Sequence, residues 1–337
     1  MEKKNNSFEE IWNKMKECKR VAMSLHSAPD GDSVGSCTAM KYVLERDLGV
    51  KVDLVSYDDV SEDLSRLDFL KDVEFGKDIS ELNLNNYDCI LFLDSGHVGS
   101  YSGKLKEDFN IPKGVYVINI DHHSTNSYYG NLNYIDSFSP AACSVLVDFF
   151  KNMEIKFDKE LSERLLLGIC TDSGFFCYDT DPEKAIRDAV FLIDNGAQYE
   201  EKILRNVLYK QPLRMKRYNA LIIDNLKINN EKKFGYSCIR YEDFKKLGLN
   251  EAEMRLGIND LQLIKEFDFV FTLNEMENYI KGSFRSKKRV DVSLFAKELG
   301  GGGHKPASAF ILSKMPLEIA VKKVLDAINK IGIQRYK

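Results

Sequence analysis

The N-terminal part of the chain alternates short, continuous apolar runs with longer stretches in which apolar residues recur at helical spacing. Four apolar runs, bounded by turn or polar residues, predict buried strands at 20–26, 50–56, 87–94 and 114–121. Five stretches have helical spacing, at 7–18, 33–49, 139–150, 159–172 and 182–197. Ser7 and Glu10 have the spacing of a capping box, and Gly49 ends the second helix. Strands that alternate with helices predict an α/β fold with a parallel sheet covered on both faces.

After residue 205 the pattern changes to that of a second, smaller α/β domain. The segment 206–226 predicts a connecting helix with a basic side. Apolar runs predict strands of a mixed sheet at 232–240, 267–277 and 278–286, with helices at 251–265, 291–299 and 316–331. We therefore expect a first domain at 1–205, a connector at 206–228 and a second domain at 229–337.

Ionisable residues follow the predicted strands at the points where the strands end. His26 closes the first strand, and Asp30 and Asp32 lie in the next loop, just before a helix. Asp94 closes the third strand and the run Asp121, His122, His123 closes the fourth, while Asp172 ends a later helix. Because open parallel sheets form their ligand crevice at the carboxyl ends of the strands, these side chains are predicted to meet there.

Five carboxylates and three imidazoles brought together would repel or stay partly protonated unless cations neutralised them. The ligands are oxygen and nitrogen without a thiolate, which suits Mn²⁺ or Mg²⁺, with Co²⁺ or Zn²⁺ as substitutes. There are enough ligands for two ions, and Asp94, alone on its strand, is the natural bridge. Such a site predicts hydrolysis of a phosphoester.

The second domain contains a run of four glycines followed by His304 and Lys305. Glycines let backbone N–H groups approach an anion closely, and the two following side chains add positive donors. Arg285, in a basic segment at 281–289, suits bidentate contact with a phosphate. We expect this domain to hold a second phosphate or a nucleotide, with the active-site cleft between the two domains.

The composition fits a globular chain of two domains. The 337 residues are too many for one ordinary core, and 44% of them are hydrophobic and 30% charged. No apolar run approaches the roughly 20 residues that span a bilayer, and the N-terminus is too polar and acidic for a signal or transit peptide. The net charge of -4 argues against long duplex nucleic acid as a partner, because duplex-binding domains usually carry a basic excess. We expect a cytoplasmic protein with no membrane partner.

The seven cysteines are scattered and never spaced as C-x-x-C, which argues against a disulfide framework or a structural zinc site. Cys170 and Cys177 flank Asp172. We expect both thiols to pack in the core rather than to bind metal.

Six motifs follow one another along the chain: HSAPDGDSVGS at 26–36, LFLDS at 91–95, IDHHST at 120–125, CTDSG at 170–174, SFRS at 283–286 and GGGGH at 300–304. In this order they resemble the motifs of the DHH/DHHA1 phosphoesterase superfamily. The best match is the short, stand-alone branch of nanoRNases, which are bifunctional oligoribonucleases, and pAp phosphatases. The resemblance covers nearly the whole chain, and the combination is highly specific although each motif alone is weak.

The resemblance implies a parallel-sheet DHH domain that holds two Mn²⁺ ions and a DHHA1 domain that binds substrate. One ion would be held by His26, Asp30 and Asp94, and the other by Asp32, Asp94, His122 and Asp172. His123 resembles the family's phosphate-facing histidine, and Asp121 the residue that orients the cluster. The implied substrate contacts are Arg285, Gly301, Gly302, Gly303 and His304.

The activity implied by the resemblance is release of 5′-mononucleotides from short single-stranded oligonucleotides and dephosphorylation of 3′-phosphoadenosine 5′-phosphate (pAp), by a homodimer. A cyclic or linear dinucleotide phosphodiesterase would use the same metals. A catalytically silent nucleotide sensor belongs to another class and would be favoured by loss of a ligand, and no ligand is lost. Processive exonucleases need further domains, and a polyphosphate hydrolase is expected to lack the GGGGH ending.

Some features depart from the pattern or have two readings. Cys177 stands where relatives often have an arginine, and His97 has no role in the motif pattern. Taken singly, Asp30 could be a helix cap and the glycine run a flexible loop. Three aromatic residues follow Asp172, and they either stack on a base or belong to the core: Phe175, Phe176 and Tyr178.

Overall fold

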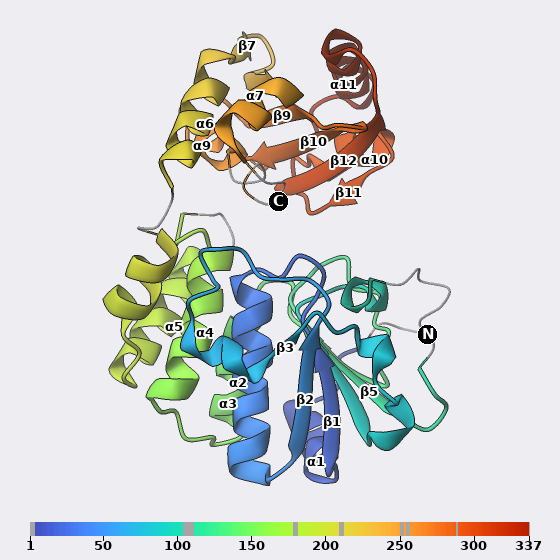
Figure 1. Ribbon diagram of the computed structural model, residues 1–337, viewed down its shortest axis with the longest axis vertical. Coiled ribbons are helices and arrows are strands. Elements are labelled where there is room, and N and C mark those ends of the chain that lie inside the picture. Colours follow the sequence, from blue (N-terminus) through green and yellow to red (C-terminus); the bar gives the residue numbers. More distant parts are fainter. Residues whose placement is uncertain are drawn as a thin grey trace. The chain divides into compact units, whose positions relative to one another are not determined.

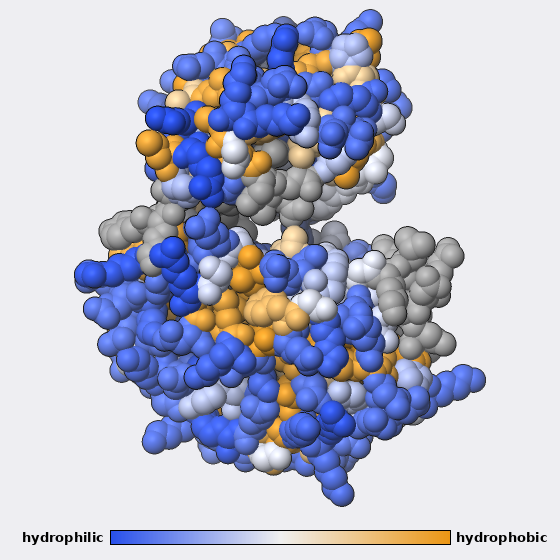
Figure 2. Space-filling model, in the orientation of Figure 1, coloured by the Kyte–Doolittle hydropathy of each residue, from blue (hydrophilic) through white to orange (hydrophobic). Residues whose placement is uncertain are grey.

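The computed structural model describes residues 4–103, 111–177, 181–208, 212–249, 253, 257–287 and 289–336. The chain divides into two compact units, Met1–Lys210 and Gln211–Lys337 (Figure 1). Each unit has its own sheet and its own apolar core. Figure 2 shows hydrophilic side chains over most of the visible face of each unit, as expected where apolar side chains gather inside. Among the described residues, every helix is too short or too polar to span a bilayer.

The N-terminal unit is built on a six-stranded parallel sheet in the order β3-β2-β1-β4-β5-β6. The strands are β1 (Arg20–Ser24), β2 (Lys51–Ser56), β3 (Glu74–Phe75), β4 (Cys89–Leu93), β5 (Tyr116–Asp121) and β6 (Leu132–Ile135). The α-helices are α1 (Phe8–Lys16), α2 (Gly31–Leu48), α3 (Ala142–Asn152), α4 (Lys159–Asp172) and α5 (Pro182–Asp194). A π-helix follows at Tyr199–Leu208. The predicted α/β fold with a parallel sheet is confirmed.

The two faces of this sheet are covered by different kinds of structure. Alternate strand residues such as Met23 and Leu91 pack against α1 to α5 in the main core. Their neighbours Ala22 and Ile90 face the other way and pack under short 3-10 turns. These turns are η2 (Ile79–Glu81), η3 (Leu84–Asn86) and η4 (Val98–Tyr101), while η1 (Asp68–Asp72) joins the main core. Both faces are therefore covered, as predicted, although among the described residues no α-helix packs on the second face.

The predicted start of α1 at Ser7 and the predicted end of α2 at Gly49 are confirmed. The Ser7 hydroxyl accepts a hydrogen bond from the Glu10 N–H at 3.1 Å, and the Glu10 carboxylate accepts one from the Ser7 N–H at 2.8 Å. Gly49 ends α2 in the left-handed conformation, with φ of 65°. Both helices thus begin or end where short-range hydrogen bonding favours it.

The C-terminal unit contains a mixed six-stranded sheet in the order β11-β12-β10-β9-β8-β7. The strands are β7 (Lys227–Asn229), β8 (Phe234–Ile239), β9 (Phe269–Glu275), β10 (Tyr279–Ser286), β11 (Gly302–Gly303) and β12 (Ala307–Ser313). Helices α10 (Ser293–Glu298) and α11 (Leu317–Ile331) pack on one face, and α6 (Leu213–Asp224), α7 (Tyr241–Leu247) and α9 (Ile258–Gln262) pack on the other. The predicted mixed sheet is confirmed.

The predicted connecting helix needs correction. The helix predicted at 206–226 is not continuous, because α6 begins at Leu213 after Pro212, and proline disfavours helix in the residue before it. The buried side of α6 packs in the second unit, through Met215, Tyr218 and Ile222. Strand β12 was not anticipated, although its alternating burial is that of a strand with one face covered.

Candidate metal centre

The carboxyl ends of three adjacent strands, β1, β4 and β5, place most of the candidate ligands. His26 follows β1 by two residues, and Asp94 directly follows β4. Asp121 is the last residue of β5 and is followed by His122 and His123. Because β4 pairs with both β1 and β5, these side chains converge at one edge of the sheet.

Two helix ends bring the remaining carboxylates to the same edge. Asp30 caps α2, where its Oδ1 accepts hydrogen bonds from the N–H groups of Asp32 and Ser33 at 3.0 Å each. Asp32 lies in the first turn of α2, and Asp172 is the last residue of α4. The cap reading of Asp30 is therefore correct, and it coexists with a place in the cluster.

Glycines allow α2 and α4 to approach closely enough for these two ends to meet. A Cβ on Gly168 of α4 would lie 2.5 Å from Asp32 Oδ1, and a Cβ on Gly35 of α2 would lie 2.5 Å from the Arg164 carbonyl oxygen. Both distances are too short for real contacts. The lack of a side chain at these two positions thus decides where Asp32 stands relative to Asp172.

Three groups of ligand atoms result, with the atoms of each group within 4.8 Å of one another. The first is His26, Asp30 and Asp94, the second is Asp32, His122 and Asp172, and the third is Asp94, Asp121, His122 and His123. Asp94 approaches the first two groups with different oxygens. Its Oδ2 is 3.4 Å from His26 Nε2, and its Oδ1 is 3.4 Å from His122 Nε2. Asp94 thus stands between the first two groups.

The distances fit divalent ions better than direct ion pairs. His122 Nε2 is 3.5 Å from Asp172 Oδ2 and 3.8 Å from Asp32 Oδ2, which is too long for hydrogen bonds. Two ligands that each lie about 2.1 Å from one ion stand roughly 3 to 4 Å apart. The donors are carboxylate oxygens and imidazole nitrogens. The nearby Cys143 thiol is not counted among them, because burial and Asp32 raise its pKa well above the ordinary range and so favour the protonated form. These residues therefore fit metal ions.

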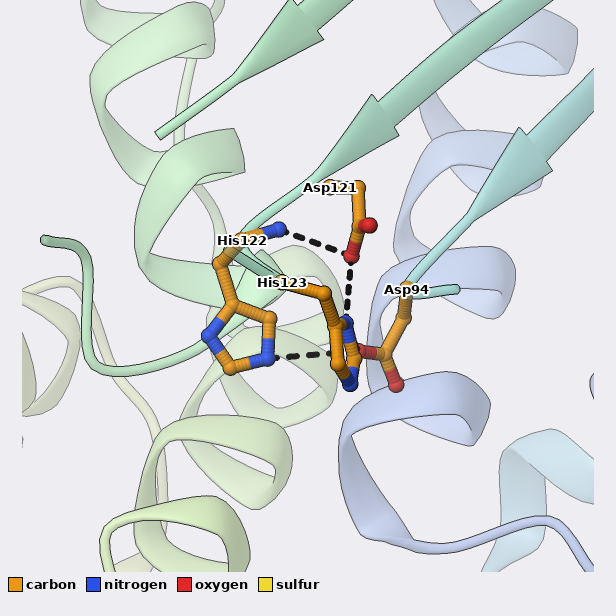
Figure 3. A group of neighbouring side chains, drawn as sticks. All are labelled: Asp94, Asp121, His122 and His123. Carbon is orange, nitrogen blue, oxygen red and sulfur yellow. Dashed lines mark hydrogen bonds and ion pairs between the residues drawn. The ribbon is translucent and has the colours of Figure 1, made fainter. Parts of the chain in front are cut away.

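Figure 3 shows how Asp121 and His123 lie beside Asp94 and His122. The buried Asp121 Oδ1 lies 2.6 Å from His123 Nδ1 and accepts a hydrogen bond from the His122 N–H at 2.8 Å. A carboxylate on Nδ1 fixes the ring orientation and leaves Nε2 for other contacts. Asp121 thus contacts both histidines that follow it in the chain.

Several supporting contacts were missed from the sequence. Asn126 donates from Nδ2 to Asp121 Oδ2 at 2.6 Å and to Asn119 Oδ1 at 2.7 Å. Asp32 accepts hydrogen bonds from the N–H groups of Ala142 and Cys143, at 2.6 and 2.9 Å, and so caps the start of α3. Two features of the sequence could have indicated these contacts. Asn126 is a polar residue shortly after the run from Asp121 to His123, and no side chain before α3 caps that helix.

The ion-free cluster holds more protons than its residues would in water. Burial raises the pKa of Asp172 to about 6, with repulsion from Asp30 and Asp94 adding to the effect and His122 opposing it. Burial and repulsion from Asp94 and Asp172 raise the pKa of Asp32 well above its usual value. Burial works against a charged His122, but Asp94, Asp172 and Asp32 outweigh it and raise its pKa. Metal binding must therefore displace protons.

We expect the affinity for divalent metal to rise with pH between about pH 5 and pH 8. Below about pH 6 a proton occupies Asp172 and competes with the ion, and above it the carboxylate is free to bind. Calorimetric titration with Mn²⁺ in buffers of different ionisation enthalpy should show proton release on binding. Asp172→Asn should bind more weakly and lose the part of the pH dependence near pH 6. An affinity that stays constant across this range would contradict the assignment.

The backbone around the cluster is strained. Asp94 has φ of 63°, a left-handed conformation that is uncommon outside glycine. Gly174, Phe175 and Phe176 form a left-handed turn of three residues after Ser173, the residue that caps the end of α4. Strain of this kind collects at functional sites, where the surrounding structure enforces it.

The other sequence candidates have mixed outcomes. Cys170 is buried as expected, but Cys177 is exposed, because it follows the left-handed turn and leaves the core. Phe175 and Phe176 are half-buried and pack against the main core. Tyr178 lies outside the described residues. His97 is exposed, directly precedes η4 and is not a member of the three ligand groups.

In the C-terminal unit the structure brings the expected substrate contacts to one end of the sheet. Arg285 on β10 pairs in register with Ala307 on β12. His304 and Ala307 close the turn between β11 and β12 through hydrogen bonds of 2.7 and 3.2 Å. A Cβ on Gly301 would lie 2.2 Å from the Ala309 carbonyl oxygen, whereas one on Gly302 would meet nothing within 4 Å. Two glycines of the run, Gly302 and Gly303, thus form strand β11 at the edge of the sheet.

Comparison with known proteins agrees with this architecture. Residues 20–169 match the DHH family, N-terminal domain, and residues 231–332 match the DHHA1 domain. The chain is 26% identical over 313 residues to the bifunctional oligoribonuclease and PAP phosphatase NrnA of Thermus thermophilus, covering 92% of this chain and 89% of the relative. It is 23% identical to the protein of the same name from Mycoplasma genitalium, covering 97% and 99% of the two chains.

A solved structure shares the fold over nearly the whole length. The exopolyphosphatase-related protein from Bacteroides fragilis superimposes with a TM-score of 0.85 at 21% identity, covering 96% of this chain and 95% of that one. The two family domains lie in the two units described above, and the first unit contains the three ligand groups. The chain belongs to the DHH/DHHA1 phosphoesterase family.

Proposed function

We propose that the N-terminal unit binds two Mn²⁺ ions and hydrolyses phosphoester bonds of short oligonucleotides and of pAp. His26, Asp30 and Asp94 would hold one ion, and Asp32, Asp94, His122 and Asp172 the other. The observation that carries the proposal is the place of Asp94, whose two oxygens face different ligand groups. Mg²⁺ or Co²⁺ would serve as substitutes, since the donors are oxygen and nitrogen.

The chemistry divides between the ions and the side chains. When bound by these residues, two divalent ions would supply an activated water and neutralise the charge that develops on the phosphoryl group. His123 would face the phosphate and donate a proton or a hydrogen bond to it, because Asp121 holds its ring by Nδ1. Burial disfavours a charged His123 ring, but Asp121 outweighs it and raises the pKa of His123, which favours the protonated, donating form.

The substrate class is supported by the relatives and by the second domain. Proteins named bifunctional oligoribonuclease and PAP phosphatase match this chain over most of its length. We extend the proposal to a catalytic domain at 1–205, a connector at 206–228 and a substrate-binding domain at 229–337, acting as a cytoplasmic homodimer. The proposed substrate contacts in the second domain are Arg285, Gly301, Gly302, Gly303 and His304.

Two other functions use the same residues. A cyclic or linear dinucleotide phosphodiesterase would need the same ions and a different hold on the second nucleotide. A silent nucleotide sensor is disfavoured, because all six proposed ligands lie together in the three groups.

The deciding experiment is product release with Mn²⁺ and with EDTA on pAp, the linear dinucleotide pApA and cyclic di-AMP. Metal-dependent cleavage of pApA and pAp, with little on the cyclic compound, is the expected result. Efficient opening of the ring would establish the dinucleotide phosphodiesterase instead. Binding without turnover of any of the three would favour the sensor.

Replacing Arg285 by alanine should mainly raise KM for substrates that carry a second phosphate. A charge-assisted contact to an anion contributes about 1.5–3 kcal/mol, so KM should rise by roughly 10- to 100-fold while kcat changes little. Steady-state kinetics on pAp and pApA measure both quantities. Lys322→Ala, which removes an exposed cation from α11, is the matched control. Wild-type kinetics in Arg285→Ala would remove Arg285 from the substrate site.

A further inference from the structure

Phe138 is the most exposed large apolar side chain among the described residues, with 86% of its surface accessible. It lies in the segment between β6 and α3, and no role proposed above involves it. Leaving a phenylalanine in water forgoes the stabilisation that burial of its ring would contribute. Single exposed apolar residues are common on protein surfaces, so the location of Phe138 decides whether its exposure has a use.

The backbone around Phe138 is fastened to the metal centre on both sides. The Asp136 N–H donates to the Asp121 carbonyl oxygen at 3.0 Å, and the Ser139 carbonyl oxygen lies 3.2 Å from His122 Nδ1. Asp136 Oδ1 also accepts a hydrogen bond from the Phe138 N–H at 3.1 Å. Phe138 is therefore one residue from a direct contact with a proposed ligand ring, on a turn held by its own hydrogen bonds.

An exposed aromatic ring on a fixed backbone is suited to stacking on a nucleotide base. Binding needs no rearrangement of the backbone, so little ordering cost opposes it. The other aromatic candidates are less suited, because Phe175 and Phe176 are half-buried against the core. Stacking of a base on an aromatic side chain contributes about 1–3 kcal/mol.

We propose that Phe138 stacks on the base of the nucleotide whose phosphate group occupies the metal centre. This inference rests on the proposed function and deepens it, since it makes the N-terminal unit select nucleotides over phosphoesters that lack a base. The C-terminal unit would then not be the sole source of substrate selection.

The test compares Phe138→Ala and Phe138→Trp with the wild type on pApA and on two analogues. In each analogue one adenosine is replaced by an abasic tetrahydrofuran residue. Phe138→Ala should raise KM for pApA by about 5- to 100-fold at a nearly constant kcat. It should have no effect on the analogue that lacks the stacked base, and Phe138→Trp should restore the wild-type KM. The analogue whose KM does not respond to Phe138→Ala is the one that lacks the stacked base. The comparison of the two analogues therefore identifies which base is stacked.

The control is Val190→Ala, which shortens a side chain that is 53% exposed on α5 and should change nothing. An unchanged KM in Phe138→Ala, or an equal rise on pApA and both abasic analogues, would overturn the inference while the proposed function stands. Absence of cleavage by the wild type would instead overturn the proposed function, and the inference with it.

A binding measurement gives a second, independent readout. Trp12 is the single tryptophan and is 5% exposed, so a tryptophan at position 138 would dominate any solvent-sensitive emission. AMP added with Mg²⁺ should quench the emission of Phe138→Trp by stacking and leave that of Val190→Trp unchanged. Equal responses in the two variants would contradict the stacking role.

Discussion

Asp94→Asn is expected to abolish hydrolysis, with kcat reduced about 1,000-fold or more. Asp94 alone faces both proposed ion sites, so its loss weakens both, and metal ions contribute several kcal/mol to phosphoryl transfer. Asparagine is the suitable replacement because it tolerates the left-handed backbone of this position better than alanine does. Turnover of pApA and metal stoichiometry measure the effect.

The same variant separates a chemical role from a structural one. Asp94 is buried beside Asp32 and Asp172, so removing its charge relieves repulsion in the ion-free protein, but it also removes the attraction of Asp94 for His26 and His122. Because these two effects oppose each other, the ion-free variant should melt near the wild-type temperature. Asp78→Asn is the matched control, because Asp78 is a buried carboxylate of the same unit that accepts hydrogen bonds from Ser102 and Gly103 instead. It should lower stability and retain activity, and the reverse pattern would refute the bridging role.

Gly168→Ala is expected to damage both stability and metal binding. The new Cβ would lie 2.3 Å from Cys143 Sγ and 2.5 Å from Asp32 Oδ1, so α2, α3 and α4 cannot keep their present spacing. Forcing a methyl group into a packed core costs about 1–3 kcal/mol. Thermal unfolding and Mn²⁺ titration should both show a loss, because the displaced carboxylate is a proposed ligand.

A double variant distinguishes the two contacts of Gly168. Adding Cys143→Ala removes the sulfur and should recover part of the stability, while the contact with Asp32 persists and metal affinity stays low. Gly49→Ala is the control, since its φ of 65° makes alanine unfavourable by about 1 kcal/mol but nothing lies within 4 Å of the new Cβ. Wild-type metal affinity in Gly168→Ala would show that the helix contact does not position Asp32.

Elements with strong local signals could be predicted closely. Helix α4 spans Lys159–Asp172, the range predicted from its spacing, and α1 begins beside its Ser7 capping box. Weak or short elements were missed, including β3, with two residues, and β11, which consists of two glycines. Such strands have no period of their own and exist because a neighbour offers its unpaired edge.

The ligand residues could be proposed from the sequence because parallel strands place their carboxyl ends together. Once Asp94 and the run from Asp121 to His123 were placed at strand ends, their proximity followed from the topology. The supporting contacts did not follow. The α3 N-terminus on Asp32 and the Asn126 bridge to Asp121 depend on how helices and loops pack, which no local pattern encodes.

The sequence by itself determined the fold class, the residues that can serve as ligands and the order in which they reach one edge of the sheet. These depend on periodicity and side-chain chemistry, which are local properties. Only the tertiary structure decided that Asp94 turns its two oxygens toward different groups and that Gly168 brings α4 against Asp32. It also decided that Phe138 remains exposed next to Ser139, whose carbonyl oxygen contacts His122. These facts depend on contacts between segments far apart in the chain, so local sequence patterns do not predict them.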